Sequence, residues 1–146
     1  MKTLVIRTGA RLTIRAIATG TDENGRDKCP TLRFFQDQAA VRAAELDKLG
    51  ALLSETADNG PLHDDKKFKD LPGTDKIYEF KTSGGLRLLC FWDEGSLIVC
   101  THGYLKSAQK APKNEIQRAE RFKRDYFQAK QDGGLIHAEP KRQSLR

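Results

Sequence analysis

The chain has 146 residues, with 26 Lys or Arg, 20 Asp or Glu and a formal net charge of +6. That length suits one domain whose hydrophobic core needs no disulfide or metal to hold it. No apolar run approaches the roughly 20 residues of a membrane-spanning helix, and arginines interrupt the N-terminal segment, so the sequence favours a cytoplasmic protein without a secretory signal.

The first predicted element is a strand. Residues 3–18 are rich in β-branched and aliphatic side chains, and residues 11–17 alternate between polar and apolar types. This alternation is typical of a strand with one buried face, so one strand is expected here. Residues 20–28 form a polar, turn-rich loop.

Two helices are predicted after that loop. Pro30 suits the first position of a short helix through Phe34 and Phe35, because the N–H group that proline lacks is not needed there. Apolar residues at steps of three and four then predict a longer helix over residues 37–56, with Asp37 as its N-cap. The Asn-Gly-Pro sequence at residues 59–61 ends that helix.

Three strands are predicted in the second half. Residues 62–74 are charged and irregular, and strands are expected over residues 76–82, 86–92 and 96–101. A Gly-Gly turn separates the first two and an Asp-Glu-Gly turn the last two, which predicts an antiparallel meander.

The last helix is predicted over residues 112–131, with glycines at 133 and 134 to end it. Residues 1–134 are interpreted as one domain, and residues 135–146 as a mobile C-terminal tail. The order of elements predicts an α+β fold: an antiparallel or mixed β-sheet of about four strands, with two N-terminal helices and a C-terminal helix on one face.

The cysteines and histidines predict neither a metal site nor a disulfide. Cys29, Cys90 and Cys100 lack metal-ligand spacing, and the three histidines are scattered. The short turn between the last two strands suggests that Cys90 lies nearer Ile98 than Cys100. Because the cytosol keeps thiols reduced, buried free thiols are expected. No metal and no cofactor are predicted.

The positive charge is concentrated in one segment. Residues 101–130 hold eight Lys or Arg against three Asp or Glu, which gives +5 of the chain's +6. Because this charge follows a strand hairpin, it predicts a surface that faces an anion, with nucleic acid as the first candidate.

Four motifs between residues 29 and 127 resemble a known family. They read Pro-x-x-x-Phe at residues 30–34, Leu-x-Gly followed by Tyr-Glu-Phe-Lys at residues 71–81, an Arg-aliphatic-aliphatic strand at residues 86–91, and His-Gly-aromatic-x-Lys with a later Pro-x-x-Glu-Ile at residues 102–116. On these motifs the chain resembles toxins of the RelE/ParE superfamily, most of all the phage-derived HigB-like branch. Lys81 stands where the family has Arg, and Ser107 where it has a second Lys.

The resemblance implies a RelE-like fold and a function. The chain would be the toxin of a type II toxin–antitoxin system, a metal-independent, ribosome-dependent mRNA endoribonuclease (mRNA interferase) that inhibits translation. Its partners would be the ribosome, mRNA and a HigA-like helix-turn-helix antitoxin, with no membrane. Two alternatives stay open: a toxin of the same fold that inhibits DNA gyrase without cutting RNA, and a decayed prophage protein that binds RNA or its antitoxin.

Five candidate catalytic residues follow from the resemblance and from their chemistry. Arg87 suits bidentate phosphate contact from a rigid strand. Lys106 and Lys81 would stabilise the charge of the transition state. Tyr104 would either stack on an unpaired base or pack at a strand end. His102 would either transfer protons or pack as a satisfied histidine.

Further basic residues would contact the RNA backbone. Such contacts position a protein without reading sequence, although the same residues also fit the solvated face of an amphipathic helix. Glu79 is expected to pair with a nearby cation. The predicted RNA-binding residues are Lys110, Lys113, Arg118, Arg121 and Arg124.

Overall fold

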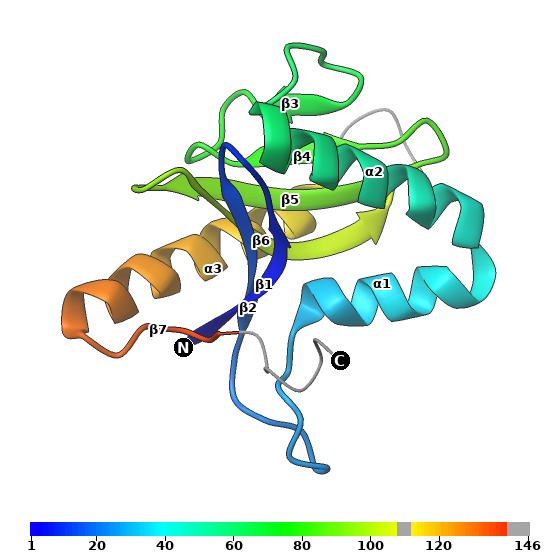
Figure 1. Cartoon of the computed structure of the whole chain (residues 1–146). Helices are drawn as coiled ribbons and strands as arrows, with labels where there is room; N and C mark the ends of the chain where they lie inside the picture. The colour runs from blue at the N-terminus through cyan, green and yellow to red at the C-terminus, as the bar shows by residue number, and fades with distance from the viewer. Residues whose placement is uncertain (108–111, 140–146) are drawn as a thin grey trace.

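The computed structural model describes residues 1–107 and 112–139 (Figure 1). These residues form seven strands and three helices, joined by loops. In chain order they are β1 (Lys2–Thr8), β2 (Thr13–Ala18), α1 (Pro30–Val41), α2 (Ala43–Asn59), β3 (Phe68–Asp70), β4 (Tyr78–Lys81), β5 (Leu86–Asp93), β6 (Leu97–Leu105), α3 (Lys113–Asp132) and β7 (Ile136–His137). The α+β class and the three predicted helices are confirmed.

The seven strands form one mixed sheet in the order β3-β4-β5-β6-β2-β1-β7, so the prediction of about four strands was too low. The pairs β2–β6 and β1–β7 are parallel and the other neighbours are antiparallel. The additional strands lie where the sequence predicted a single strand, an irregular segment and a mobile tail.

The N-terminal segment is a hairpin rather than one strand. The amide of Gly9 donates to the carbonyl of Leu12 over 3.1 Å, and the amides of Arg11 and Leu12 donate to the carbonyl of Ala57 at the end of α2. A partner 45 residues or more along the chain therefore holds the turn between β1 and β2. The alternation of polar and apolar residues in this segment does not indicate that Ala57 is the partner.

The start of the predicted tail is also ordered into a strand. The amide of Ile136 donates to the carbonyl of Met1 over 3.0 Å, and the amide of Ala138 donates to that of Thr3 over 2.9 Å. The start of the predicted tail therefore forms β7, because β1 supplies a parallel edge to which these residues bond. Residues 140–146 of the predicted tail lie outside the described residues.

The two N-terminal helices meet at Arg42, not before Asp37 as predicted. Pro30 is the first residue of α1, as expected, whereas Asp37 lies exposed inside that helix and caps nothing. Arg42 has φ −140° and ψ 51°, which interrupts the helical path. The break lets Phe34 of α1 and Leu49 of α2 both reach the sheet.

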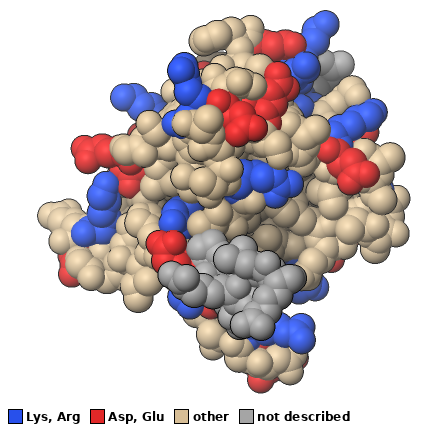
Figure 2. Space-filling model, in the orientation of Figure 1, with Lys and Arg blue, Asp and Glu red and all other residues tan. Residues whose placement is uncertain are grey.

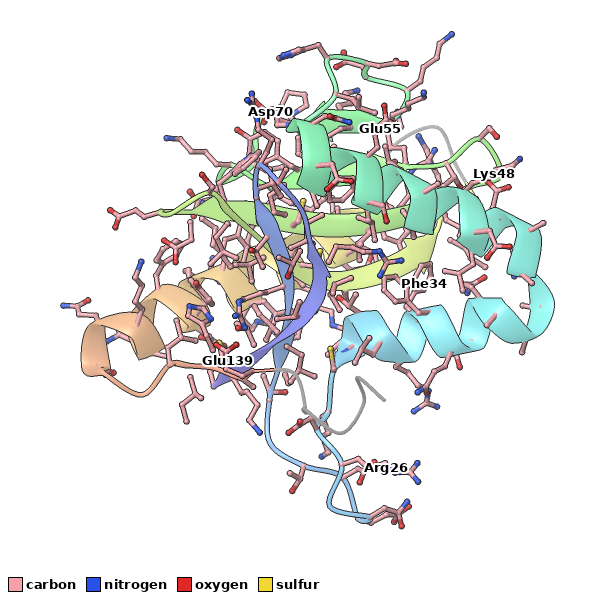
Figure 3. All side chains as sticks on the ribbon, viewed as in Figure 1. Arg26, Phe34, Lys48, Glu55, Asp70 and Glu139 are labelled. Atoms are coloured by element: carbon pink, nitrogen blue, oxygen red, sulfur yellow. The ribbon has the colours of Figure 1, made fainter. Side chains whose placement is uncertain are left out.

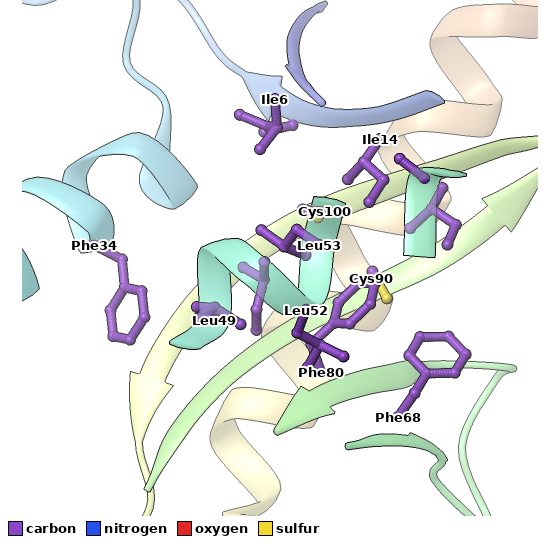
Figure 4. Packing of buried hydrophobic residues seen from close by; sticks show 14 of the residues in the cluster. Ile6, Ile14, Phe34, Leu49, Leu52, Leu53, Phe68, Phe80, Cys90 and Cys100 are labelled. Atoms are coloured by element: carbon purple, nitrogen blue, oxygen red, sulfur yellow. The ribbon is translucent and has the colours of Figure 1, made fainter. Parts of the chain in front are cut away.

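Helices cover both faces of the sheet, which corrects the prediction of one covered face (Figure 1). On one face α1 and α2 enclose a core, shown in Figure 4, in which Leu49 and Leu53 pack with Phe80. On the other face Ala119 and Tyr126 of α3 pack with strand residues. The central strand β5 is accordingly buried on both sides along most of its length.

The β5–β6 hairpin places Cys90 opposite Cys100 rather than near Ile98. The strands reach Asp93 and resume at Leu97, so three turn residues set a register that the short-turn expectation missed. All three cysteines are buried and free, as predicted. The strand β6 continues to Leu105, so the His-Gly-aromatic motif lies within a strand.

Candidate functional site

Strand pairing places the predicted site residues in two rows on one face of the sheet. Lys81 of β4 lies opposite Arg87 of β5, which lies opposite Tyr104 of β6. Directly paired residues of antiparallel strands project to the same face. Tyr104 packs in the same cluster as Ala119 of α3, so this is the face beside α3. The neighbouring row contains Lys69, Glu79, Leu89 and His102.

Arg87 is buried, and its guanidinium is held by neighbours on β4 and in the β4–β5 turn. Its Nε atom lies 3.0 Å from Oε1 of Glu79, with the N–H pointing off that line, so the contact is an ion pair and not a hydrogen bond. Its Nη1 atom donates to the carbonyls of Thr82 (2.8 Å) and Leu86 (2.9 Å). The residue is 8% exposed. Its charge thus faces the protein, whereas the sequence suggested an arginine turned toward a phosphate.

Glu79 links two of the predicted residues. It pairs with a cation, as expected, and its second carboxylate oxygen accepts a hydrogen bond from the hydroxyl of Tyr104 over 3.2 Å. Glu79 is 3% exposed. A buried carboxylate is tolerated only with such partners. Glu79 therefore acts as the bridge between Arg87 and Tyr104.

Tyr104 is packed in the sheet face rather than presented outward. It is 6% exposed, which matches the second of its two sequence-based alternatives. Burial, together with the neighbouring carboxylate of Glu79, raises the pKa of the Tyr104 phenol well above its ordinary value. The phenol is therefore protonated at neutral pH and donates a hydrogen bond.

Lys81 and Lys106 are partly exposed cations of the cluster, as is Lys69. Burial lowers the pKa of Lys81, and the charge of Arg87 lowers it further, with smaller effects of the same sign from Lys69 and Lys106. The amide of Lys106 donates to the carbonyl of Gly85 over 2.8 Å, which fixes this residue beside the β4–β5 turn. The carboxylate of Glu79 opposes this lowering of the Lys81 pKa. Arg87, paired with Glu79, and Lys69, opposite Glu79 on β3, add two more cations to the cluster, an arrangement that favours a bound anion.

His102 lies beneath the site and ties β6 to α3. It is 1% exposed, with Nδ1 3.1 Å from the Thr101 hydroxyl and Nε2 3.1 Å from Oε1 of Glu115. Burial and then the charge of Arg118 lower the pKa of His102, although Glu115 opposes them. The ring is therefore neutral at neutral pH. Sequence reasoning did not select Glu115, even though it lies in the same motif.

The predicted RNA-binding residues lie on the outside of α3. Lys113, Arg118, Arg121 and Arg124 are all exposed, and the guanidinium of Arg118 lies 5.5 Å from the centre of a phenylalanine ring of α3. Lys110 lies outside the described residues. On the face that carries α2, positive and negative side chains are interspersed, as Figure 2 shows.

Two motifs that the sequence singled out separately touch each other. Phe34, labelled in Figure 3, points from α1 toward the sheet, where its ring lies against Gly103 of β6. A Cβ atom at Gly103 would overlap that ring. The glycine between His102 and Tyr104 therefore lets α1 pack directly on the strand that carries both residues.

Within residues 1–107 and 112–139, no three His, Cys, Asp or Glu side chains are grouped so that they could hold a metal ion, and no helix there is long and apolar enough to cross a membrane. The family model described as phage derived protein Gp49-like (DUF891) matches residues 36–124. That range contains the whole charged cluster and most of α3. Comparison with curated proteins gave no significant match.

Proposed function

Because the chain belongs to the family of phage-derived Gp49-like proteins, we propose that it is the toxin of a type II toxin–antitoxin system and that it cleaves messenger RNA on the ribosome. The family belongs to the RelE/HigB-like toxin superfamily of phage-derived toxin–antitoxin proteins. Within it, the HigB-like branch is the proposed place of this chain. The proposed reaction needs no metal and no cofactor, and it stops translation.

One observation carries the proposal of a nuclease: the cations gathered on the sheet face beside α3. The pairing of β4 and β5 brings Lys81 opposite Arg87, and the amide of Lys106 bonds to Gly85 in the turn between those strands. Preorganised positive charge is the main requirement for stabilising a phosphorane-like transition state. The partly exposed lysines at the cluster are placed to meet a phosphate, with the buried Arg87 behind them.

The proposed reaction is an intramolecular transfer within RNA. The 2′-oxygen attacks the adjacent phosphorus and loses its proton to a base, while the bond from phosphorus to the 5′-oxygen breaks and that oxygen gains a proton. Lys81 is the proposed base, since its lowered pKa increases the neutral fraction. Lys106 is the proposed donor of that proton because it is partly exposed, whereas the phenol of Tyr104 is buried and holds Glu79 in place through its hydrogen bond. Lys106 and Arg87 stabilise the negative charge.

His102 is proposed as a positioning residue. Its ring is buried and is held by Thr101 and Glu115, so it fixes the first turn of α3 relative to β6. The exposed cations of α3 then lie beside the cluster, where they would contact the RNA backbone. Because each such contact releases counterions, binding should weaken steeply as salt rises.

While translation in the cell is not inhibited, the proposed partner is an antitoxin of the HigA-like helix-turn-helix type. Its role follows from the toxin–antitoxin family to which the chain belongs. The strongly basic composition, with a sequence pI of about 9.3, suits a partner with an acidic segment.

The test is inducible expression in bacteria with primer extension on an abundant mRNA. A Lys81→Met/Lys106→Met variant removes two partly exposed cations, and an Arg11→Met variant removes an exposed charge beside the β1–β2 turn as a control. Growth arrest with new cleavage sites is expected for the wild type and the control, and at least a hundredfold less cleavage for the double variant. Undiminished cleavage by the double variant would refute the cationic site.

A second candidate function is favoured by the burial of Arg87. Its guanidinium is committed to Glu79 and to two backbone carbonyls, which is a structural arrangement as much as a catalytic one. A decayed relative that binds RNA or its antitoxin without cutting would keep this packing. No growth arrest on expression would select that candidate, and arrest with intact mRNA would point to DNA gyrase or another protein target.

A further inference from the structure

A second basic surface adjoins the predicted site, between α2 and the β4–β5 turn. It is a groove with a volume of about 660 Å³. One wall is the side of α2 that presents Lys48 and Glu55, both labelled in Figure 3, and the other holds Lys66 and Lys67 from the segment before β3. Sequence analysis selected none of these residues, because their segments are far apart in the chain.

The groove carries an excess of positive charge. Its lining includes five Lys or Arg against two carboxylates, those of Glu55 and Asp64. Arg87 is paired with Glu79 and Lys48 with Glu45 over 3.4 Å, and the other three lysines still outnumber the two carboxylates. The Asp64 carboxylate accepts a hydrogen bond from the amide of Lys66 over 2.9 Å, so it is already used to shape the turn. The amide of Lys81 donates to the carbonyl of Lys67 over 2.8 Å, which anchors this wall to β4.

The floor of the groove is apolar. Ala51 and Leu52 lie between Lys48 and Glu55 at the spacing that gives one stripe of a helix. No aromatic side chain lines the groove within the part of the chain that the structure describes. Grooves that bind single-stranded RNA stack bases on aromatic platforms, which this surface lacks. A basic rim around an apolar floor suits an acidic peptide with an apolar anchor.

We propose that this groove binds an acidic segment of a protein partner. One apolar side chain of the segment packs on Ala51 and Leu52, and its carboxylates pair with Lys48, Lys66 and Lys67. Because Lys81 and Arg87 also line the groove, an occupied groove ends at the cationic cluster and blocks access to it. That inhibition rests on the proposed nuclease function, whereas the binding of the segment does not.

The test is selection of a random 12-residue peptide display library on the whole protein, followed by affinity measurement of the enriched peptides by fluorescence polarisation. Enriched peptides should combine several Asp or Glu with one large apolar residue. A Lys48→Glu/Lys67→Glu variant should bind them at least tenfold more weakly. A matched Arg11→Glu/Arg26→Glu variant, with the same change in charge at exposed positions away from the groove, should bind them like the wild type.

Three results would overturn the proposal: no enriched peptides, enriched peptides without acidic residues, or acidic peptides that bind both double variants equally. An RNA function of the groove has its own signature, which is weaker binding of a 12-nucleotide oligouridine by the Lys48→Glu/Lys67→Glu variant with peptide binding unchanged. The nuclease assay is separate because it measures RNA cleavage and not peptide binding, although its Lys81→Met/Lys106→Met variant changes one residue that also lines the groove. Peptide binding with no RNA cleavage would refute the proposed function and leave the groove assignment standing.

Discussion

The buried pair of Arg87 and Glu79 offers the sharpest test of how this site is built. Their side chains are 10% and 4% exposed, and the two charged atoms are 3.0 Å apart. With an effective dielectric constant of about 20, the Coulomb energy at that distance is roughly 5.5 kcal/mol. Replacing one partner of a buried pair costs about 3–5 kcal/mol, because it leaves the other charge buried without compensation. Arg87→Met should therefore lower the free energy of unfolding by that amount.

The same reasoning predicts that a second substitution restores stability. In Arg87→Met/Glu79→Gln no charge remains buried, and the glutamine oxygen still accepts the hydrogen bond of Tyr104. The double variant should recover about 2 kcal/mol relative to Arg87→Met. Urea unfolding of wild type, both single variants and the double variant measures this coupling. If the two single effects add within about 0.5 kcal/mol, the pair is not coupled and the reasoning fails.

Gly103→Ala should destabilise the protein by about 1–3 kcal/mol, because the new methyl group overlaps the ring of Phe34. Gly134→Ala meets no atom within 4 Å and should change the melting temperature little, so a large equal loss in both variants would contradict this packing. For His102, the folded state has the lower pKa, so the unfolded chain binds a proton first as pH falls. The free energy of unfolding of the wild type should therefore decrease below about pH 6.5. In urea unfolding, His102→Gln should show a smaller decrease between pH 7 and pH 5. The same dependence of this free energy on pH in both proteins would refute the lowered pKa of His102.

Arg87 shows why the site could be found from sequence but not described from it. The strand motif selected Arg87 as a residue of interest, and the family match covers it. Its burial depends on Glu79, eight residues away and brought into the neighbouring row by the β4–β5 register. For this reason the loss of activity in an Arg87 variant alone cannot separate chemistry from folding, whereas Lys81 and Lys106 can be replaced at a partly exposed surface.

The amino-acid sequence by itself determined the features that depend on local chemistry. Pro30 begins α1, Gly60 and Gly133 follow the ends of α2 and α3, and the apolar runs of the second half form β5 and β6. These outcomes depend on the backbone preferences of a few neighbouring residues, which a single sequence displays.

Only the tertiary structure decided how many strands the sheet has and which way the charges face. β3 and β7 exist because an adjoining strand supplies their hydrogen bonds, and the β1–β2 turn is held by the carbonyl of Ala57. In the same way, Glu79 turns the charge of Arg87 inward, and packing of α2 beside Lys66 forms the basic groove. Each of these features depends on contacts between residues that are distant in the chain and come together only on folding. The local preferences of single residues do not predict such contacts.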